Sequence, residues 1–394
     1  MIKREKYISE LLLYKNKPFI KVLTGLRRVG KSVLLDMYVD QLVNSGINKE
    51  NVLKINFELP EFFNIIDYNN LTDYVINWTK NKEGSLYLIL DEIGRVENWE
   101  KAVNAFHTMS IFDIYITGSN ADLLSSDLST YLAGRYVEIP VYPLSYKEFT
   151  KLYPNSKFND YIIFGGMPSI SALELDYKLS MNVLRDAFRS AVFQDIVTRH
   201  RIRNAFVLEK LILYVFQNTG KTFSALSISK YFKSQNIKVS VDTVLNYLDI
   251  IEDSFLIYRV RRNDIIGKSI LKTEEKYFVA DHGMREAIIG GNQQSIELIL
   301  ENIVYTELLR RGYTVYIGKV KEFEVDFIAK KENLQEYYQV CYLLESKKVR
   351  EREFGVYNLI PDNFPKYVIS MDTINFSSNG TIHKNIVDFL EESN

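Results

Sequence analysis

The segment that most constrains this chain spans residues 25–32, with the sequence GLRRVGKS. It follows the apolar run PFIKVLT and precedes the run SVLLDMYVDQLV, so the pattern predicts a strand, a glycine-containing loop and a helix. Such a loop presents backbone N–H groups at the start of a helix, where the helix dipole also favours bound phosphate. The alternative, an ordinary glycine turn before a helix, is disfavoured because the motif and its context agree.

The loop predicts how ATP and Mg²⁺ would be bound. Lys31 is expected to reach the β and γ phosphates, and the Ser32 hydroxyl is expected to hold Mg²⁺. The side chains of Arg27 and Arg28 are expected to point away, because backbone groups form the phosphate cradle. The predicted nucleotide-binding residues here are Gly25, Leu26, Arg27, Arg28, Val29, Gly30, Lys31, Ser32 and Val33.

An apolar run that ends in two acids, YLILDE, occupies residues 87–92. Asp91 at the end of this strand is expected to bind Mg²⁺ through its water shell, and therefore to belong to the nucleotide site. Glu92 is expected to polarise the attacking water as a general base. Alone, the pair could equally cap a core strand, but the upstream loop favours the catalytic interpretation.

A third apolar run, IYITGSN, ends in small polar residues. If its strand lies beside the two motif strands, Ser119 or Asn120 would face the γ-phosphate or the attacking water. An ordinary strand-to-turn cap is the alternative, since Gly-Ser-Asn is typical of turns. Arg135 follows, and either neutralises transition-state charge, in cis or from a neighbouring subunit, or is a surface arginine.

The apolar runs between residues 18 and about 140 alternate with helical patterns. Buried strands separated by helices are typical of a parallel sheet in an α/β domain, which is the predicted fold class. The run NVLKINF lies between the two motifs and predicts an extra strand, the insertion that separates additional-strand ATPases from kinase-like P-loop proteins.

Four segments together resemble the prokaryotic AAA-type ATPases that carry a C-terminal domain of unknown function: GLRRVGKS, LILDEIGRVENWE, YITGSN and LAGRYVEIPVYPLSYKEF. The resemblance continues through FGGMPS, FQDIVTRHRIRN, KYFVADHGMR and ENIVYTELLRRGY, and so covers nearly the whole chain. It implies Mg²⁺-dependent ATP hydrolysis, but it does not name a biological task.

The middle of the chain predicts three helices followed by a β-hairpin, the order of a winged helix. Ser240 is a plausible N-cap of the recognition helix. Six arginines could contact DNA phosphates, whereas the recognition helix itself is apolar and acidic, which favours a protein partner. The arginines are Arg199, Arg201, Arg203, Arg259, Arg261 and Arg262.

The last segment resembles the PD-(D/E)XK nuclease fold and is expected to run helix, three strands, helix, strand, helix. The resemblance places Glu301, Glu324, Asp326 and Gln339 at a vestigial metal site. Cys341 occupies the position of the nuclease lysine, and a thiol carries no positive charge there. We therefore expect a nuclease-like fold that binds a partner and does not cut DNA.

The formal net charge of the 394 residues is −1, which excludes a global basic field, and the single cysteine excludes a disulfide framework. The sequence lacks a signal peptide and a long apolar run, so we expect a cytoplasmic protein without membrane contact. The predicted domains are 1–155 (ATPase), 156–285 (helical and winged-helix) and 286–394 (nuclease-like). An ATP-driven switch, acting at double-stranded DNA, is the first hypothesis. A signalling or scaffold ATPase that binds protein, an ATP-dependent nuclease and a homo-oligomer are the others.

Overall fold

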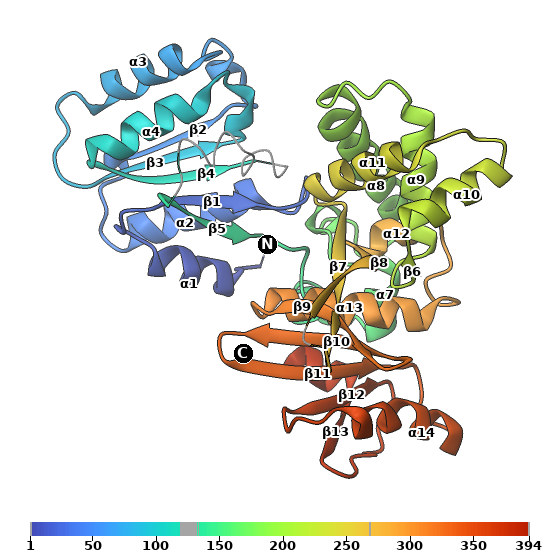
Figure 1. Cartoon of the computed structure of the whole chain (residues 1–394). Coiled ribbons are helices and arrows are strands. Elements are labelled where there is room, and N and C mark those ends of the chain that lie inside the picture. Colours follow the sequence, from blue (N-terminus) through green and yellow to red (C-terminus); the bar gives the residue numbers. More distant parts are fainter. Residues whose placement is uncertain (1, 119–131, 133, 268, 393–394) are drawn as a thin grey trace. The chain divides into compact units, whose positions relative to one another are not determined.

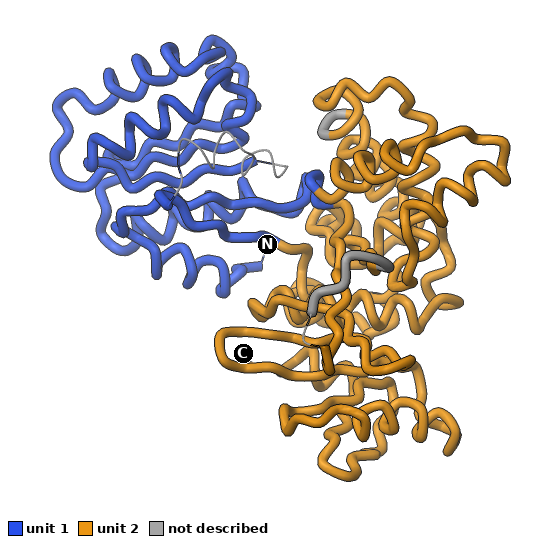
Figure 2. Tube along the Cα trace, viewed as in Figure 1, with its two compact units in different colours: residues 1–141, 253–255 blue, residues 142–252, 256–394 orange. Residues whose placement is uncertain are grey.

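The computed structural model describes residues 2–118, 132, 134–267 and 269–392. These form two compact units (Figure 2): unit 1 contains residues 1–141 and 253–255, and unit 2 contains residues 142–252 and 256–394. Apart from residues 253–255, the predicted second and third domains both lie within unit 2. The division into three domains therefore stays a prediction.

Unit 1 is built on a five-stranded sheet with the order β2-β3-β4-β1-β5, in which every neighbouring pair is parallel. This confirms the predicted α/β class. The NVLKINF run does form a strand, β2, but this strand lies at the edge of the sheet. The strand between β1 and β3 is β4, so the prediction that NVLKINF supplies the inserted strand is wrong. The strands are β1 (Ile20–Thr24), β2 (Val52–Asn56), β3 (Leu86–Asp91), β4 (Phe112–Thr117) and β5 (Tyr136–Pro140).

Helices cover both faces of this sheet, which is why the central strands β1 and β3 are buried along their whole length and mostly apolar. Figure 1 shows α1 (Glu5–Leu13) and α2 (Lys31–Asn44) on one face, and α3 (Tyr68–Thr79) and α4 (Trp99–Met109) on the other. Apolar side chains of α3 and α4 form one core cluster with strand residues. Short 3-10 helices complete the unit: η1 (Lys49–Asn51), η2 (Pro60–Phe62) and η3 (Ile93–Arg95).

Unit 2 begins with a group of helices. Two of the segments that carry the family resemblance, FGGMPS and VADHGMR, contact each other within this group. The Asp281 carboxylate accepts hydrogen bonds from the backbone N–H groups of Gly166 (2.7 Å) and Met284 (2.8 Å). A Cβ on Gly283 would lie 2.1 Å from the carbonyl oxygen of Phe164, so FGGMPS and VADHGMR pack too closely for a larger residue. These helical elements are α6 (Tyr146–Leu152), α7 (Phe158–Phe164), η5 (Pro168–Ile170), α8 (Tyr177–Ser190), η6 (Ala191–Thr198) and α12 (His282–Ile288).

Three further helices and a hairpin follow the predicted order in the middle of the chain. Ser240 accepts a hydrogen bond from the Thr243 N–H (3.1 Å) at the start of α11, as predicted for an N-cap. The hairpin strands are longer than expected, and β8 also pairs with the short β6. These elements are α9 (Ala205–Gln217), β6 (Thr222–Phe223), α10 (Ala225–Ser234), α11 (Val241–Asp253), β7 (Ile257–Asp264) and β8 (Ser269–Val279).

The hairpin strands and the C-terminal strands form one eight-stranded mixed sheet with the order β13-β12-β11-β10-β9-β7-β8-β6. The predicted C-terminal order lacked one strand, β13, because the short polar run TIHKN gives a weak strand pattern. The elements are α13 (Ile296–Arg310), β9 (Thr314–Val320), β10 (Phe323–Lys331), β11 (Leu334–Val340), α14 (Lys347–Gly355), η7 (Val356–Leu359), β12 (Lys366–Ser370), β13 (Thr381–Asn385) and α15 (Ile386–Glu391).

Candidate functional site

The glycine loop connects the carboxyl end of β1 to the first turn of α2. Gly25 has φ +135°, and a Cβ at this position would lie 2.2 Å from the carbonyl oxygen of Val141. Gly30, the residue before α2, has φ +96°. Both positions favour glycine, because an L side chain is strained at positive φ and the space beside Gly25 is filled. The two motif glycines therefore shape the loop itself.

Lys31 is buried at the start of α2, with 4% of its surface exposed. Its Nζ donates hydrogen bonds to the carbonyl oxygens of Gly25 (2.7 Å) and Leu26 (3.2 Å). The ammonium group is thus held against the loop that the sequence predicts as the phosphate cradle. Ser32 is partly exposed and Val33 is exposed on the same first turn.

Strand β4 lies between β1, which leads into the glycine loop, and β3, which ends in the two acids. Thr117 is the register partner of Leu23 on β1, and its hydroxyl donates a hydrogen bond of 2.6 Å to Oδ1 of Asp91 on β3. Asp91 is fully buried. Its second oxygen, Oδ2, is buried and has no hydrogen-bond partner among the described residues. An unsatisfied buried carboxylate oxygen is costly, and a hydrated cation would satisfy it.

Glu92 follows Asp91 in a left-handed conformation, with φ 56°. Such strain at a non-glycine residue is concentrated at functional sites. Its N–H donates to Oγ1 of Thr117 across 2.9 Å, which fixes the backbone. Burial raises the pKa of the Glu92 carboxyl, whereas the Lys31 charge lowers it and the Asp91 charge raises it. These influences place Glu92, Lys31 and Asp91 in one electrostatic environment.

The two loop arginines differ in their surroundings. Arg27 forms an ion pair with Glu58 at 3.4 Å, and Glu58 also pairs with Arg95 at 2.7 Å. Arg28 is exposed, with φ 65°. The prediction that both side chains point away from a nucleotide stays a prediction. Thr117 has no motif that marks it in the sequence, although it is a buried hydroxyl at the end of the adjacent strand.

The remaining nucleotide-site predictions concern Ser119, Asn120 and Arg135. Ser119 and Asn120 lie outside the described residues. Arg135 directly precedes β5, at the amino end of the strands, and its guanidinium contacts the Asn104 side chain. The glycine loop follows β1 at the carboxyl end, since Ile20 pairs with Tyr136 and Thr24 with Pro140. A role for Arg135 toward a nucleotide on its own chain does not fit this placement.

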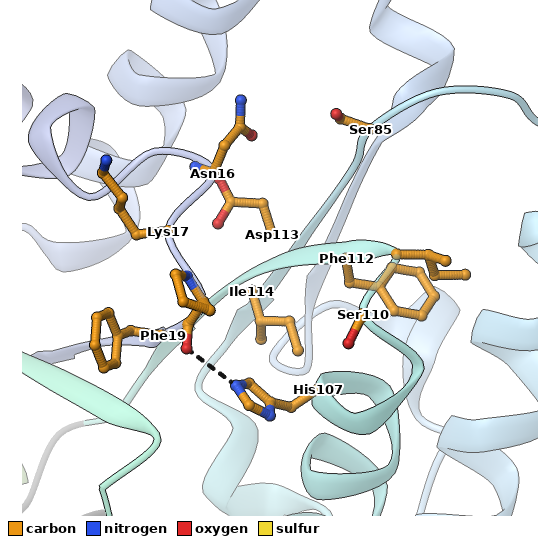
Figure 3. A pocket seen from close by; sticks show the side chains of 11 residues that line it. Asn16, Lys17, Phe19, Ser85, His107, Ser110, Phe112, Asp113 and Ile114 are labelled. Atoms are coloured by element: carbon orange, nitrogen blue, oxygen red, sulfur yellow. Dashed lines mark hydrogen bonds between the residues drawn. The ribbon is translucent and has the colours of Figure 1, made fainter.

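A cavity of about 300 Å³ lies at that amino end of the sheet, away from the glycine loop (Figure 3). Asp113 accepts hydrogen bonds there from the Asn16 N–H (2.9 Å) and the Tyr115 hydroxyl (2.8 Å), and it also pairs with buried Lys21. The Nε2 atom of His107 lies 3.3 Å from the carbonyl oxygen of Pro18. Because these groups already have partners, the cavity does not resemble a phosphate site.

In unit 2, the structure brings predicted vestigial nuclease residues together around a residue that the sequence analysis missed. Lys276 of β8 lies with its Nζ 2.7 Å from Glu324 and 3.3 Å from Glu301. Asp326 and Gln339 contact each other through the Asp326 N–H and the Gln339 side-chain oxygen (2.7 Å). Cys341 is buried, and burial raises the pKa of its thiol, so it stays neutral. Among the described residues, no cluster of three or more His, Cys, Asp or Glu is arranged to hold a metal.

Two of the three hairpin arginines are engaged in ion pairs. Arg259 contacts Asp249 and Glu252 of α11, the latter at 3.1 Å. Arg262 lies 3.8 Å from Glu324. Two of the six arginines predicted as phosphate ligands therefore already face carboxylates.

The parallel sheet, the glycine loop and the acidic strand end place unit 1 among the P-loop AAA-type domains. Residues 17–150 match a family described as an AAA domain, and residues 155–295 match a domain of unknown function. An uncharacterized protein of Haemophilus influenzae is 39% identical over 94% of this chain and 93% of its own length. An uncharacterized protein of Methanocaldococcus jannaschii is 31% identical over 96% of this chain and 87% of its own length. The chain belongs to the same family as these two proteins.

Two solved structures show a weaker similarity. A Walker-type ATPase of Pyrococcus abyssi gives a TM-score of 0.49 at 14% identity, covering 73% of this chain and 95% of that chain. The Aeropyrum pernix ORC1 protein, solved in complex with DNA, gives 0.33 at 12% identity, covering 73% and 92%. At these scores neither similarity bears on the function of this chain. Over the part of the chain that the structure describes, none of the helices has the length and apolar character of a membrane span.

Proposed function

We propose that this protein binds ATP with Mg²⁺ at the glycine loop and hydrolyses it, and that hydrolysis switches the state of unit 2. The observation that carries the proposal is Asp91, whose Oδ1 is held by Thr117 while Oδ2 is buried without a partner among the described residues. A fixed carboxylate with one open oxygen suits a magnesium ion that keeps its water shell. Ser32, on the first turn of α2, would supply the second protein oxygen.

The residues of the loop divide the chemistry between them. Bound Mg²⁺ would neutralise charge on the phosphate oxygens. Lys31 would exchange the carbonyl oxygens of Gly25 and Leu26 for oxygens of the β and γ phosphates, so the loop itself responds to nucleotide. Glu92 would accept the proton of the attacking water, and its raised pKa makes it a better base than an ordinary glutamate.

Lys31→Ala tests the proposal directly. We expect weaker ATP binding and a loss of turnover of at least about 100-fold, because the variant lacks the cation on the transferring phosphate. Lys80→Ala, at an exposed lysine directly after α3, is the matched control and should behave as wild type. If Lys31→Ala keeps wild-type affinity and turnover, the nucleotide site lies elsewhere.

A second candidate function, contact with double-stranded DNA, is favoured by a group of exposed lysines in unit 2. The exposed lysines are Lys221, Lys230, Lys233 and Lys238, on and around α10, and the pair that lines a common hollow, Lys233 and Lys238, defines the lysine face. A cavity of about 780 Å³ lies against it, lined by Lys233, Lys238 and the capping residue Ser240. The helices and hairpin would then form a winged helix that meets phosphates through α10, because α11 presents acids and the nearby Arg259 is paired.

Salt-dependent binding of duplex DNA, with and without ATP, distinguishes this candidate from a protein partner. If the lysine face contacts DNA, Lys233→Gln/Lys238→Gln should weaken binding and lower the slope of log K against log salt by about 2. Lys347→Gln/Lys348→Gln on α14 removes the same charge from exposed positions and is the control. Equal slopes in both variants, or no DNA binding, would leave the protein-binding hypothesis.

A further inference from the structure

The nuclease-like resemblance implies a divalent metal among Glu301, Glu324 and Asp326, but the structure places a lysine there. Lys276 comes from β8, outside the segment that carries the resemblance, and only 4% of its surface is exposed. Its Nζ lies 2.7 Å from Oε1 of Glu324 and 3.3 Å from Oε2 of Glu301. One ammonium group thus bridges the helix α13 and the strand β10.

The other groups that a metal would need are also engaged. Oδ2 of Asp326 accepts the N–H of Val340 at 2.8 Å. The Gln339 side chain accepts the N–H of Asp326 through its oxygen and donates to Glu353 through its nitrogen, at 3.0 Å. Gln339, the predicted fourth ligand, therefore ties Asp326 to α14 and has no oxygen directed to a shared cation.

The charges and dimensions favour the lysine over a divalent ion. Mg²⁺ requires near-octahedral oxygen ligands at about 2.0–2.1 Å, and an ammonium group between the same carboxylates would repel it. Glu301 and Glu324 are partly buried and repel each other. Removal of Lys276 would take this cation from Glu301 and leave Glu324 with the more distant Arg262 at 3.8 Å, which is unfavourable. The two carboxylates need a cation between them, and the Lys276 ammonium group is that cation.

We propose that the Lys276 ammonium group is the built-in cation of the Glu301–Glu324–Asp326 cluster and takes the place of a divalent metal ion. The residue ties the hairpin strand β8 to α13 and β10 without requiring metal. Phosphodiester cleavage at this cluster would need a metal-activated water, so the lysine also keeps it from acting as a nuclease.

The proposal is tested by measuring Mn²⁺ binding to the full-length chain by electron paramagnetic resonance, in the absence of nucleotide. All variants carry Asp91→Asn, which removes the metal ligand proposed in unit 1. With Lys276 present we expect no Mn²⁺ at the cluster. Lys276→Met should gain about one Mn²⁺ per chain, with a Kd on the order of 0.1–1 mM, typical of weak carboxylate sites. Adding Asp326→Asn should remove the gained site, and Lys276→Arg should not create one.

Thermal unfolding decides the case in which Lys276→Met folds poorly. Mn²⁺ should then raise the melting temperature of Lys276→Met or restore its folding. Neither EDTA nor Mn²⁺ should change the melting temperature of the parent, the Asp91→Asn chain that retains Lys276. The proposal is overturned if Lys276→Met neither binds Mn²⁺ nor is stabilised by it. It is also overturned if the parent binds one Mn²⁺, or nicks supercoiled plasmid with Mn²⁺, in a manner that Asp326→Asn abolishes.

Discussion

The Thr117 hydroxyl donates a hydrogen bond of 2.6 Å to Oδ1 of Asp91, across the boundary between β4 and β3. Oγ1 of Thr117 in turn accepts the N–H of Glu92 at 2.9 Å. One fully buried side chain therefore orients both acids at the strand end. Thr117 acts through these acids, so it is a positioning residue.

Thr117→Val should keep ATP binding and lower turnover by about 10- to 100-fold. A hydrogen bond to a charged group contributes about 1.5–3 kcal/mol, and about 1.4 kcal/mol corresponds to a factor of ten in rate. Steady-state turnover at varied Mg²⁺ measures the effect, and the Mg²⁺ concentration that gives half-maximal activity should rise because Asp91 loses its fixed orientation. Thr117→Ser retains the hydroxyl and should recover most of the activity. Equal losses in both variants would indicate a packing defect.

Glu92→Gln should keep ATP binding and lower hydrolysis by about 10²- to 10⁴-fold, because the amide preserves the shape but cannot accept a proton. In the wild type, burial raises the pKa of Glu92 above its ordinary 4.5. Hydrolysis needs the deprotonated form, so activity should fall as pH drops through this raised pKa, at a higher pH than for an exposed glutamate. The pH dependence of kcat/KM checks the direction. An acid limb at or below pH 4.5 would exclude Glu92 as the base.

Arg135→Ala distinguishes a residue supplied by a neighbouring subunit from a structural one. If Arg135 serves a neighbour's nucleotide, turnover per chain should rise with protein concentration, and the variant should lose about 10³-fold while still binding ATP. Asn104→Ala removes the contact that Arg135 makes within its own chain. If Asn104→Ala reproduces the defect, the role is structural. Concentration-independent turnover with full activity in Arg135→Ala would give the same answer.

The buried Lys21–Asp113 pair should make a large difference to stability. Lys21 is fully buried and Asp113 nearly so, and Asp113→Asn should destabilise the protein by about 3–5 kcal/mol because a buried ammonium loses its partner. The double variant Lys21→Met/Asp113→Leu should recover most of this loss. Asp36→Asn, which breaks the exposed pair with Lys54, should cost at most about 1 kcal/mol. Urea unfolding measures all three. A small effect of Asp113→Asn alone would show that the interior admits water.

The nucleotide loop could be predicted because its residues are neighbours in the chain. Gly25, Gly30 and Lys31 lie in one strand–loop–helix segment, and Asp91 and Glu92 end one strand. The geometry of such segments follows from local backbone conformation and apolar periodicity, both of which the sequence carries directly. The same reasoning gave the parallel sheet, but not which strand lies between β1 and β3.

The sequence by itself determined a P-loop α/β unit, its two motif glycines and the acidic strand end. Only the tertiary structure decided which side chains complete these sites. Thr117 reaches Asp91 across 26 residues of chain, and Lys276 reaches Glu301 across 25. Neither contact has a sequence signature, because a pattern predicts which face of a strand is buried but not which strand lies opposite. The physical reason is that strand order follows from packing of the whole sheet, whereas motif geometry follows from adjacent backbone dihedrals.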